Sequence, residues 1–281
     1  MRPLIPVEER APTVPGERIG LDTLAREPVW QETTTSLLGH TPALPERLAH
    51  GDGTGTEGID LVMLDVGGTI YDDDCIAQAL MRATQELAGP RFDEHAFWHL
   101  YDHGRQTQSA LRMPVAEHFG LDSEELWARE ATHVEYPPSA LYADVKPTLD
   151  LLATRYKLGT ASQSDATIEA MRRDDLLDYF TVVATPSAAG ANKTETRFWK
   201  WALDEAGVPA GRAVHVGNRL DSDIRPTKRI GMRAIWLLRG EAPPSPTVEQ
   251  LSEPDAVVTS FSGVPNALAG LADVRVPIGA R

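Results

Sequence analysis

The stretch "IDLVMLDVGGTIYDDD" (residues 59–74) decides how the rest of the chain is interpreted. An apolar run from Ile59 to Leu64 ends on Asp65, and two glycines, a threonine and further aspartates follow. Continuous apolar runs of this length are typical of strands buried on both faces of a parallel sheet. The glycines allow backbone N–H groups to approach an anion closely. The stretch therefore predicts a buried strand that delivers one carboxylate to a ligand-binding turn.

The composition bounds the class of protein. The chain has 281 residues, of which 42% are hydrophobic and 24% charged, as in an ordinary globular protein of one or two domains. The net charge of −14 argues against binding nucleic acid or an anionic membrane through bulk electrostatics. The single cysteine, Cys75, cannot form an intrachain disulfide. No apolar run approaches the about 18–20 residues of a membrane-spanning helix, and acids and prolines interrupt the N-terminal segment where a signal peptide is apolar. We therefore expect a cytoplasmic protein.

Strands and helices are predicted to alternate after Ile59. Further short apolar runs that predict strands are Tyr156–Ala161, Phe180–Thr185, Ala213–Val216 and Ala234–Leu238. Helical patterns occur at "KPTLDLLATR" (146–155), "TETRFWKWALDEAG" (194–207) and "SDIRPTKRIG" (222–231). This alternation predicts an α/β fold with a Rossmann-like parallel sheet, whose ligands bind at the carboxyl ends of the strands.

The remaining segments suggest how the chain is divided. Residues 1–58 hold seven of the 21 prolines and end in "HGDGTGTEG", which predicts a flexible extension. Residues 72–145 show mostly helical spacing and are too long for a simple crossover, so we expect an inserted helical subdomain. The core then comprises residues 59–71 and 146–262, and residues 263–281 are predicted to be a C-terminal tail.

Polar side chains follow the predicted strands at the edge where ligands bind. Asp65 follows the first strand, Ser162 the second, Lys193 the third, and Asn218, Asp221 and Asp223 the fourth. Carboxylate and amide oxygens suit a hard cation such as Mg²⁺, while a hydroxyl and an ammonium group can hold phosphate oxygens. Asp65 is then free to act as a nucleophile. The set as a whole predicts phosphoryl chemistry.

Four segments, in this order, resemble the motifs of the haloacid dehalogenase superfamily. They are "LDVGGTI" (64–70), "TASQS" (160–164), "NKTETRF" (192–198) and "HVGNRLDSDIRPTKRIGMRAIWL" (215–237). The resemblance covers roughly Ile59 to Leu238. It implies a Rossmann-like core, a mobile cap formed by the helical insertion, and Mg²⁺-dependent hydrolysis of a small phosphomonoester through an aspartyl-phosphate intermediate.

The resemblance also implies roles for individual residues. Asp65 and Lys193 are the implied catalytic residues. The expected phosphate-binding residues are Gly68, Thr69, Ser162, Gln163 and Lys193. The expected metal ligands are Asp65, the carbonyl group of Gly67, Asn218 and Asp223.

Two positions depart from the family pattern. Gly67 stands where the family has a second aspartate, the general acid/base, and Asn218 stands where it has an acid of the fourth motif. A positioned general acid/base contributes about 10²–10⁴ in rate, so its absence weakens or redirects catalysis. A binding or regulatory protein without turnover therefore remains an alternative, as does a dehalogenase-like hydrolase. A phosphonatase is disfavoured because residues 72–144 contain no lysine for an imine.

Other acids and bases near these motifs allow less specific interpretations. Asp72, Asp73 and Asp74 are expected to form a solvated turn rather than additional metal ligands. His95, His99 and His103 are spaced four residues apart, opposite an apolar stripe, which favours a solvent-exposed face. If that face instead covers Asp65, His99 or His103 replaces the missing acid. Arg105 or Arg112 either contacts an anionic substrate or has a surface role.

Overall fold

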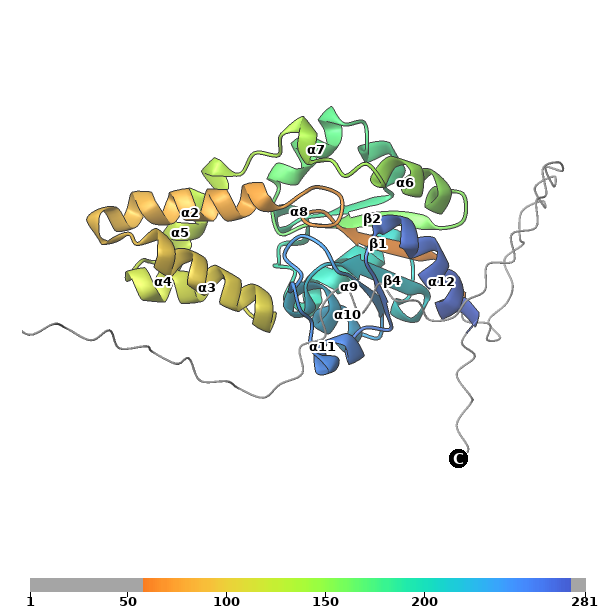
Figure 1. Cartoon of the computed structure of the whole chain (residues 1–281). Coiled ribbons are helices and arrows are strands. Elements are labelled where there is room, and N and C mark those ends of the chain that lie inside the picture. The colour runs from red at the N-terminus through yellow and green to blue at the C-terminus, as the bar shows by residue number, and fades with distance from the viewer. Residues whose placement is uncertain (1–57, 274–281) are drawn as a thin grey trace, which may run out of the picture.

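The computed structural model describes residues 58–273, and its centre is a six-stranded parallel sheet (Figure 1). The strand order is β3-β2-β1-β4-β5-β6. The strands are β1 (Leu61–Asp65), β2 (Lys157–Ala161), β3 (Val182–Ala184), β4 (Ala213–Gly217), β5 (Arg233–Leu237) and β6 (Ala256–Val258). The predicted α/β fold with a Rossmann-like parallel sheet is confirmed.

The central strand β1 is buried on both of its faces, as its apolar run predicts. Val62 and Leu64 pack in one hydrophobic cluster, whereas Leu61 and Met63 pack in another on the opposite face, because successive side chains of a strand alternate. Strand β6 has no counterpart in the sequence analysis. It is a three-residue edge strand whose residues are only partly buried or exposed, so its apolar run is too short to stand out.

Helices cover both faces of the sheet (Figure 1). One face carries α6 (Val145–Ala153), α7 (Ala166–Arg173) and α12 (Val264–Asp273). The other carries α9 (Thr196–Ala206) and α10 (Arg225–Arg229). Helix α9 buries Phe198 and Trp199 against the sheet and ends at Gly207, which adopts the left-handed conformation expected of a helix C-cap.

The C-terminal segment corrects one expectation. Residues 263–281 are predicted above to be a tail, but residues 264–273 form helix α12. Val264 and Leu268 are fully buried in the cluster that also contains Leu149 of α6. The apolar spacing of this short helix becomes meaningful only when the face of the sheet that it covers is known.

The insertion (residues 72–145) is helical and extends away from the sheet (Figure 1). It contains α2 (Asp74–Ala88), α3 (Glu94–Thr107), α4 (Arg112–Phe119) and α5 (Ser123–His133). These helices share a hydrophobic cluster of their own, centred on Leu80, Phe97 and Val115. Asp122 caps the N-terminus of α5, because its carboxylate accepts a hydrogen bond from the N–H of Glu125 at 2.9 Å.

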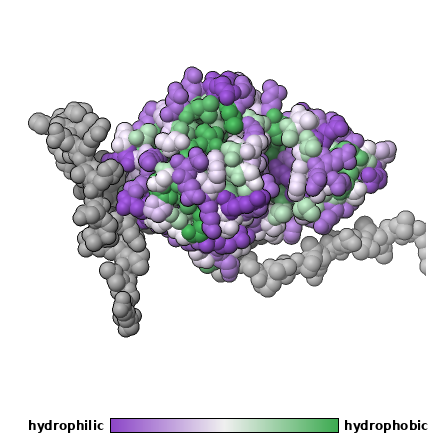
Figure 2. All heavy atoms as spheres, turned by 180° about the vertical axis from the view of Figure 1, so that it is seen from behind, coloured by the Kyte–Doolittle hydropathy of each residue, from purple (hydrophilic) through white to green (hydrophobic). Residues whose placement is uncertain are grey.

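Shorter elements complete the described chain. They are the helices α8 (Pro186–Ala189) and α11 (Val248–Ser252), the π-helix Leu220–Ile224, and the 3-10 helices Gly89–Arg91, Pro138–Ala140, Leu177–Tyr179, Ala210–Arg212 and Phe261–Gly263. Within residues 58–273, no helix has both the length and the apolarity that crossing a membrane requires. Hydrophilic residues cover most of the face shown in Figure 2, and hydrophobic residues gather there in patches.

Candidate active site

The buried ammonium group of Lys193 joins two carboxylates at the carboxyl end of the sheet. It forms an ion pair with Asp65, the last residue of β1, and lies 2.5 Å from Asp223, which follows β4. Lys193 is 1% exposed and Asp65 7% exposed, so the pairing takes place away from bulk water. The sequence analysis places all three residues at this edge, and the structure brings them together.

Asp223 is held by more than Lys193. Its Oδ1 atom lies 2.9 Å from Nε2 of His215, and its Oδ2 atom accepts a hydrogen bond from the backbone N–H of Arg219 at 2.9 Å. Burial alone would raise the pKa of Asp223, but the charge of Lys193 and the His215 contact outweigh it and hold the pKa well below its usual value. Both Asp223 oxygens thus already have protein partners. These contacts fix the Asp223 carboxylate, which in turn positions the ammonium group of Lys193.

His215 is a site residue that the sequence analysis does not identify. It is fully buried in β4 beside Trp199, and burial lowers the pKa of its imidazole, which favours the neutral ring. The sequence signal was weak, because one histidine inside an apolar strand resembles any core position.

The nucleophile candidate Asp65 experiences opposing effects. Burial and the nearby charge of Asp223 raise the pKa of its carboxyl group, whereas Lys193 lowers it. The raising effects prevail, and the pKa lies at about 7. The ion pair with Lys193 opposes this shift and favours the charged carboxylate, the form required for nucleophilic attack.

The expected phosphate-binding residues divide into two groups. Ser162 and Gln163 line the cavity above Asp65, and the Ser162 hydroxyl donates to the carbonyl of Ser164 at 3.0 Å. Gly68 and Thr69 are not among the residues that line this cavity, and their role in binding phosphate stays a prediction. The N–H of Gly68 donates within its own turn to the carbonyl of Tyr71, and Thr69 is fully buried.

Gly68 instead permits close packing. It has a φ of +68°, and a Cβ atom there would lie 1.8 Å from Nδ2 of Asn218. A glycine is therefore required for this turn to pack against the polypeptide that follows β4.

Asp73 also differs from expectation. Asp72 is partly buried and Asp74 exposed, as in a solvated turn, but Asp73 is only 4% exposed. Its Oδ2 atom accepts hydrogen bonds at 3.1 Å from Nδ2 of Asn218 and from the N–H of Glu241. Burial and the charge of Glu241 raise the pKa of the Asp73 carboxyl group well above its usual value. The sequence could not single out Asp73, since its two neighbours are also aspartates.

Gly67 of the core packs closely against side chains of the insertion. A Cβ atom at this position would lie 3.2 Å from the hydroxyl oxygen of Tyr136 and 3.7 Å from Cβ of Asp73. The Tyr136 hydroxyl is buried and has no hydrogen-bond partner among the described residues. The hydroxyl of Tyr136 therefore lies directly beside the position that the side chain of a larger residue 67 would take. No motif in the sequence marks this tyrosine.

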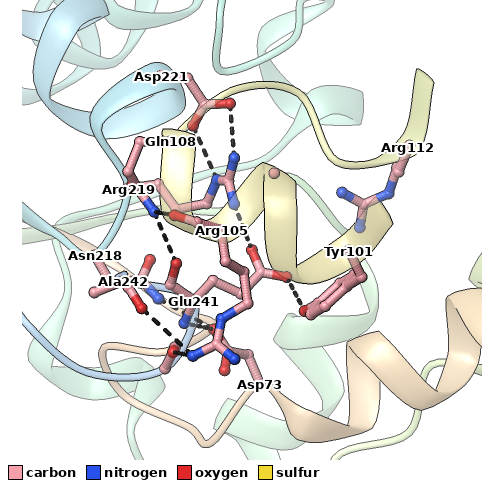
Figure 3. Close-up of polar contacts among 12 residues, drawn as sticks. Asp73, Tyr101, Arg105, Gln108, Arg112, Asn218, Arg219, Asp221, Glu241 and Ala242 are labelled. Carbon is pink, nitrogen blue, oxygen red and sulfur yellow. Dashed lines mark hydrogen bonds and ion pairs between the residues drawn. The ribbon is translucent and has the colours of Figure 1, made fainter. Parts of the chain in front are cut away.

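A network of polar contacts connects the insertion to the core (Figure 3). The carboxylate of Glu241 accepts from the Tyr101 hydroxyl at 2.6 Å and from Arg219 at 3.3 Å. Arg219 also binds Asp221, with contacts of 2.8 and 2.9 Å. Gln108 donates to the Glu241 carbonyl at 2.9 Å. The cation of Arg219 is therefore already balanced by acids.

The substrate contacts expected from the insertion are only partly supported. His99 and His103 are exposed, and neither they nor Arg105 lines the cavity. Arg105 instead donates to the carbonyl of Gly240 at 2.9 Å. Arg112 does line the cavity and forms a bidentate pair with Glu130 at 2.6 and 2.7 Å. The histidine stripe belongs to the outer face of α3, so His99 and His103 cannot replace the missing acid in this arrangement.

The donor set at the strand ends fits a hard cation. Asp65 and the carbonyl of Gly67 offer oxygen atoms as ligands. The amide nitrogen of Asn218 donates to Asp73, which leaves the amide oxygen of Asn218 available as a further ligand. Asp223 is less available because of the contacts described above. Asp72, Asp73 and Asp74 also place carboxylate oxygens within 4.8 Å of one another.

Comparison with known proteins identifies the family. The family model of the haloacid dehalogenase-like hydrolases matches residues 59–231. The chain is 33% identical over 100 residues to a glyceraldehyde 3-phosphate phosphatase of Methanocaldococcus jannaschii, a stretch that covers 34% of this chain and 43% of that protein.

Two solved structures are similar over nearly their whole length. A phosphatase of this family from Thermococcus onnurineus is 26% identical with a TM-score of 0.52, covering 75% of this chain and 99% of its own. A 2-haloacid dehalogenase from Pseudomonas syringae is also 26% identical, with a TM-score of 0.50 and coverages of 76% and 99%. Because the family model matches residues 59–231 and polar residues converge at the strand ends, this chain belongs to the haloacid dehalogenase-like hydrolases.

Proposed function

We propose that the protein is a Mg²⁺-dependent phosphatase that hydrolyses a small phosphomonoester through Asp65. The observation that carries this proposal is the buried contact of Lys193 with both Asp65 and Asp223. It places a cation beside the carboxylate that would attack, at the ligand-binding edge of the sheet. The phosphatases among its relatives support the same reaction class.

The reaction follows from these positions. A carboxylate oxygen of Asp65 forms a bond to phosphorus, and the bond from phosphorus to the alcohol oxygen breaks, so the departing oxygen keeps the electron pair. Lys193, Ser162 and Gln163 hold the non-bridging oxygens of the transferred group. Water then cleaves the acyl phosphate, releasing phosphate and restoring Asp65.

Asp65, Asn218, the Gly67 carbonyl and Asp223 are the residues that would hold Mg²⁺. When bound, the ion supplies positive charge to offset the negative charge on the phosphoryl oxygens. Replacing the usual acid by Asn218 removes one negative charge, so we expect the ion to be held weakly. We further propose that the insertion, residues 72–145, acts as a cap that selects the substrate, while residues 59–71 and 146–262 form the catalytic core.

The test is hydrolysis of 4-nitrophenyl phosphate with and without Mg²⁺ by the parent and by Asp65→Asn. This substitution nearly preserves the shape of the side chain and removes the nucleophile, so we expect a folded protein without turnover. An Asp65→Asn variant as fast as the parent would refute the nucleophile assignment. A parent that binds phosphate without turnover would instead favour a binding or regulatory role.

Dehalogenation is a second candidate function. Gly67 lacks the acid that phosphatases use, and one structural relative is a 2-haloacid dehalogenase. Release of halide from 2-haloacids, lost in Asp65→Asn, together with no phosphate release from any ester, would favour this reaction instead.

A further inference from the structure

The cavity above Asp65 has two chemically different ends. It has a volume of about 400 Å³, enough for a small organic phosphate. Its core end is polar and carries Asp65, Ser162 and Lys193. The part of its lining that comes from the insertion is mostly apolar, apart from Asp73 and the paired Arg112 and Glu130. The apolar side chains there are Ile76, Leu111, Met113, Trp127, Val134 and Tyr136.

Two of these apolar side chains are unusually exposed. Trp127 is 43% and Met113 40% exposed, and they are two of the five large hydrophobic residues exposed in residues 58–273. Single exposed apolar residues are common, but two that line the same cavity indicate a surface for an apolar ligand. The indole of Trp127 can stack on an aromatic ring.

The charges of the cavity point the same way. Each of its cations is already paired: Lys193 with Asp65 and Asp223, Arg112 with Glu130, and Arg219 with Asp221 and Glu241. Its lining contains five acids, Asp65, Asp73, Glu130, Asp221 and Glu241, but three cations. Lys193 is assigned to the phosphate. Within the described residues, Arg112 and Arg219 are the other cations of the cavity, so a second anionic group of the substrate would have to compete with the acids that already pair with them.

From this arrangement we infer that the substrate is the phosphate monoester of an aromatic alcohol. We infer further that it has no anionic group besides the phosphate. Its phosphate would face Asp65, and its ring would lie against the apolar wall that includes Trp127. The inference rests on the proposed function for the position of the phosphate. Gly67 is consistent with it, because aromatic alcohols such as phenols leave readily without a positioned acid.

The first experiment separates recognition of the ring from leaving-group reactivity. Benzyl phosphate and 2-hydroxyethyl phosphate release alcohols of similar acidity, but only the first has an aromatic ring. We expect the parent to favour benzyl phosphate in kcat/KM by about tenfold or more, the effect of one well-placed aromatic contact. Equal values would overturn the inference.

Variants then test the wall. Trp127→Ala should lower kcat/KM for benzyl phosphate about tenfold and leave that for 2-hydroxyethyl phosphate nearly unchanged. The matched control is Leu151→Ala, which removes another exposed apolar side chain, 48% exposed and outside the cavity, and should change neither value. Equal losses for both substrates in Trp127→Ala would contradict a specific contact with the ring.

A charge variant tests the exclusion of a second anion. Glu130→Gln keeps the size of the side chain but leaves Arg112 without its carboxylate partner. The ratio of kcat/KM for 4-carboxybenzyl phosphate to that for benzyl phosphate should be low in the parent and rise severalfold in this variant. A parent that prefers the carboxylated ester would overturn the inference.

Binding measurements distinguish this inference from the proposed function. Calorimetry with Asp65→Asn compares benzylphosphonate with 2-hydroxyethylphosphonate, neither of which needs to react. If the protein binds the aromatic phosphonate more tightly but the parent hydrolyses no ester, the proposed phosphatase function is refuted and the inferred aromatic ligand is supported. If the parent hydrolyses esters but shows no preference for the aromatic phosphonate, the phosphatase function is supported and the inferred aromatic ligand is refuted.

Discussion

Single residues account for the unusual chemistry next to Asp65. Gly67 lies beside the hydroxyl of Tyr136, which is buried and has no hydrogen-bond partner among the described residues. Burying a hydroxyl without a partner costs about 1–3 kcal/mol. The folded state therefore carries a local cost where the family has a carboxylate.

Removing this hydroxyl should not destabilise the protein. We expect Tyr136→Phe to leave the free energy of unfolding unchanged or to raise it by about 1 kcal/mol. The matched control is Tyr71→Phe, whose ring lies 5.2 Å from that of Tyr136 and whose hydroxyl donates to Asp174 at 2.9 Å. This control should lose about 1 kcal/mol in denaturant unfolding. A similar loss in Tyr136→Phe would mean that its hydroxyl has a partner.

Introducing a carboxylate at residue 67 should change which esters react. Without an acid there, the rate should depend steeply on the acidity of the leaving alcohol. We expect Gly67→Asp to raise turnover of alkyl phosphates selectively, by up to about 10²–10⁴. The new Cβ would meet Ile76 and the Tyr136 hydroxyl at 3.2 Å, so these side chains must shift slightly.

The measurement for Gly67→Asp is the slope of log rate against leaving-group pKa. A shallow slope already in the parent would show that another group protonates the leaving oxygen. Asp73 would then be mutated next, because its Cβ lies 3.7 Å from the point that a Cβ of residue 67 would occupy. Tyr136→Phe added to Gly67→Asp should reduce the gain, because the new carboxylate can accept the tyrosine hydrogen bond.

At the level of elements, Asp144 joins three segments of the core. It precedes α6, both of its oxygens accept from Arg239 after β5 at 2.9 and 3.0 Å, and Oδ2 accepts from the N–H of Phe261 at 2.8 Å. Burial alone would raise the pKa of Asp144, but the hydrogen bonds and charge of Arg239 outweigh it and hold the pKa below its usual value.

This contact should make part of the stability depend on pH. Because the pKa is lower in the folded state, the stabilisation is complete above the unfolded pKa of about 4 and is lost as pH falls through the folded pKa. We expect Asp144→Asn to cost about 1–3 kcal/mol near neutral pH. In urea unfolding, the difference between parent and variant should shrink toward about pH 3. A difference that stays constant with pH would contradict the charged contact.

For the whole molecule, the prediction concerns residues 1–58, of which residues 1–57 lie outside the described part. Their proline-rich and glycine-rich composition indicates no contribution to the hydrophobic core. We expect a chain beginning at Gly58 to keep the activity of the full chain and a melting temperature within about 3 °C. A much larger drop would show that the N-terminal segment packs on the core.

Local patterns in the sequence were sufficient to predict five of the six described strands and the polar residues at their ends. Buried strands need continuous apolar runs, and such runs mark β1, β2, β3, β4 and β5 without any knowledge of their neighbours. Asp65, Ser162 and Asn218 follow three of them, so parallel pairing alone predicts that they share one edge. Lys193 comes after the third predicted strand, and the resemblance between local motifs supports the same position. Each apolar run and the polar residue at its end are adjacent in the sequence, so both can be recognised without knowing the tertiary structure.

The side chains that complete the site became evident only in the folded arrangement. Asp73 is buried while its neighbour Asp74 is exposed, and nothing in three consecutive aspartates distinguishes them. Tyr136 and Glu241 reach the site from segments distant in sequence, and the histidines of α3 miss it because that helix turns its other face inward. Helix α12 and strand β6 likewise gain their partners only when the sheet is assembled. The physical reason is that burial and side-chain partners depend on packing between remote segments, which a local pattern of residues does not encode.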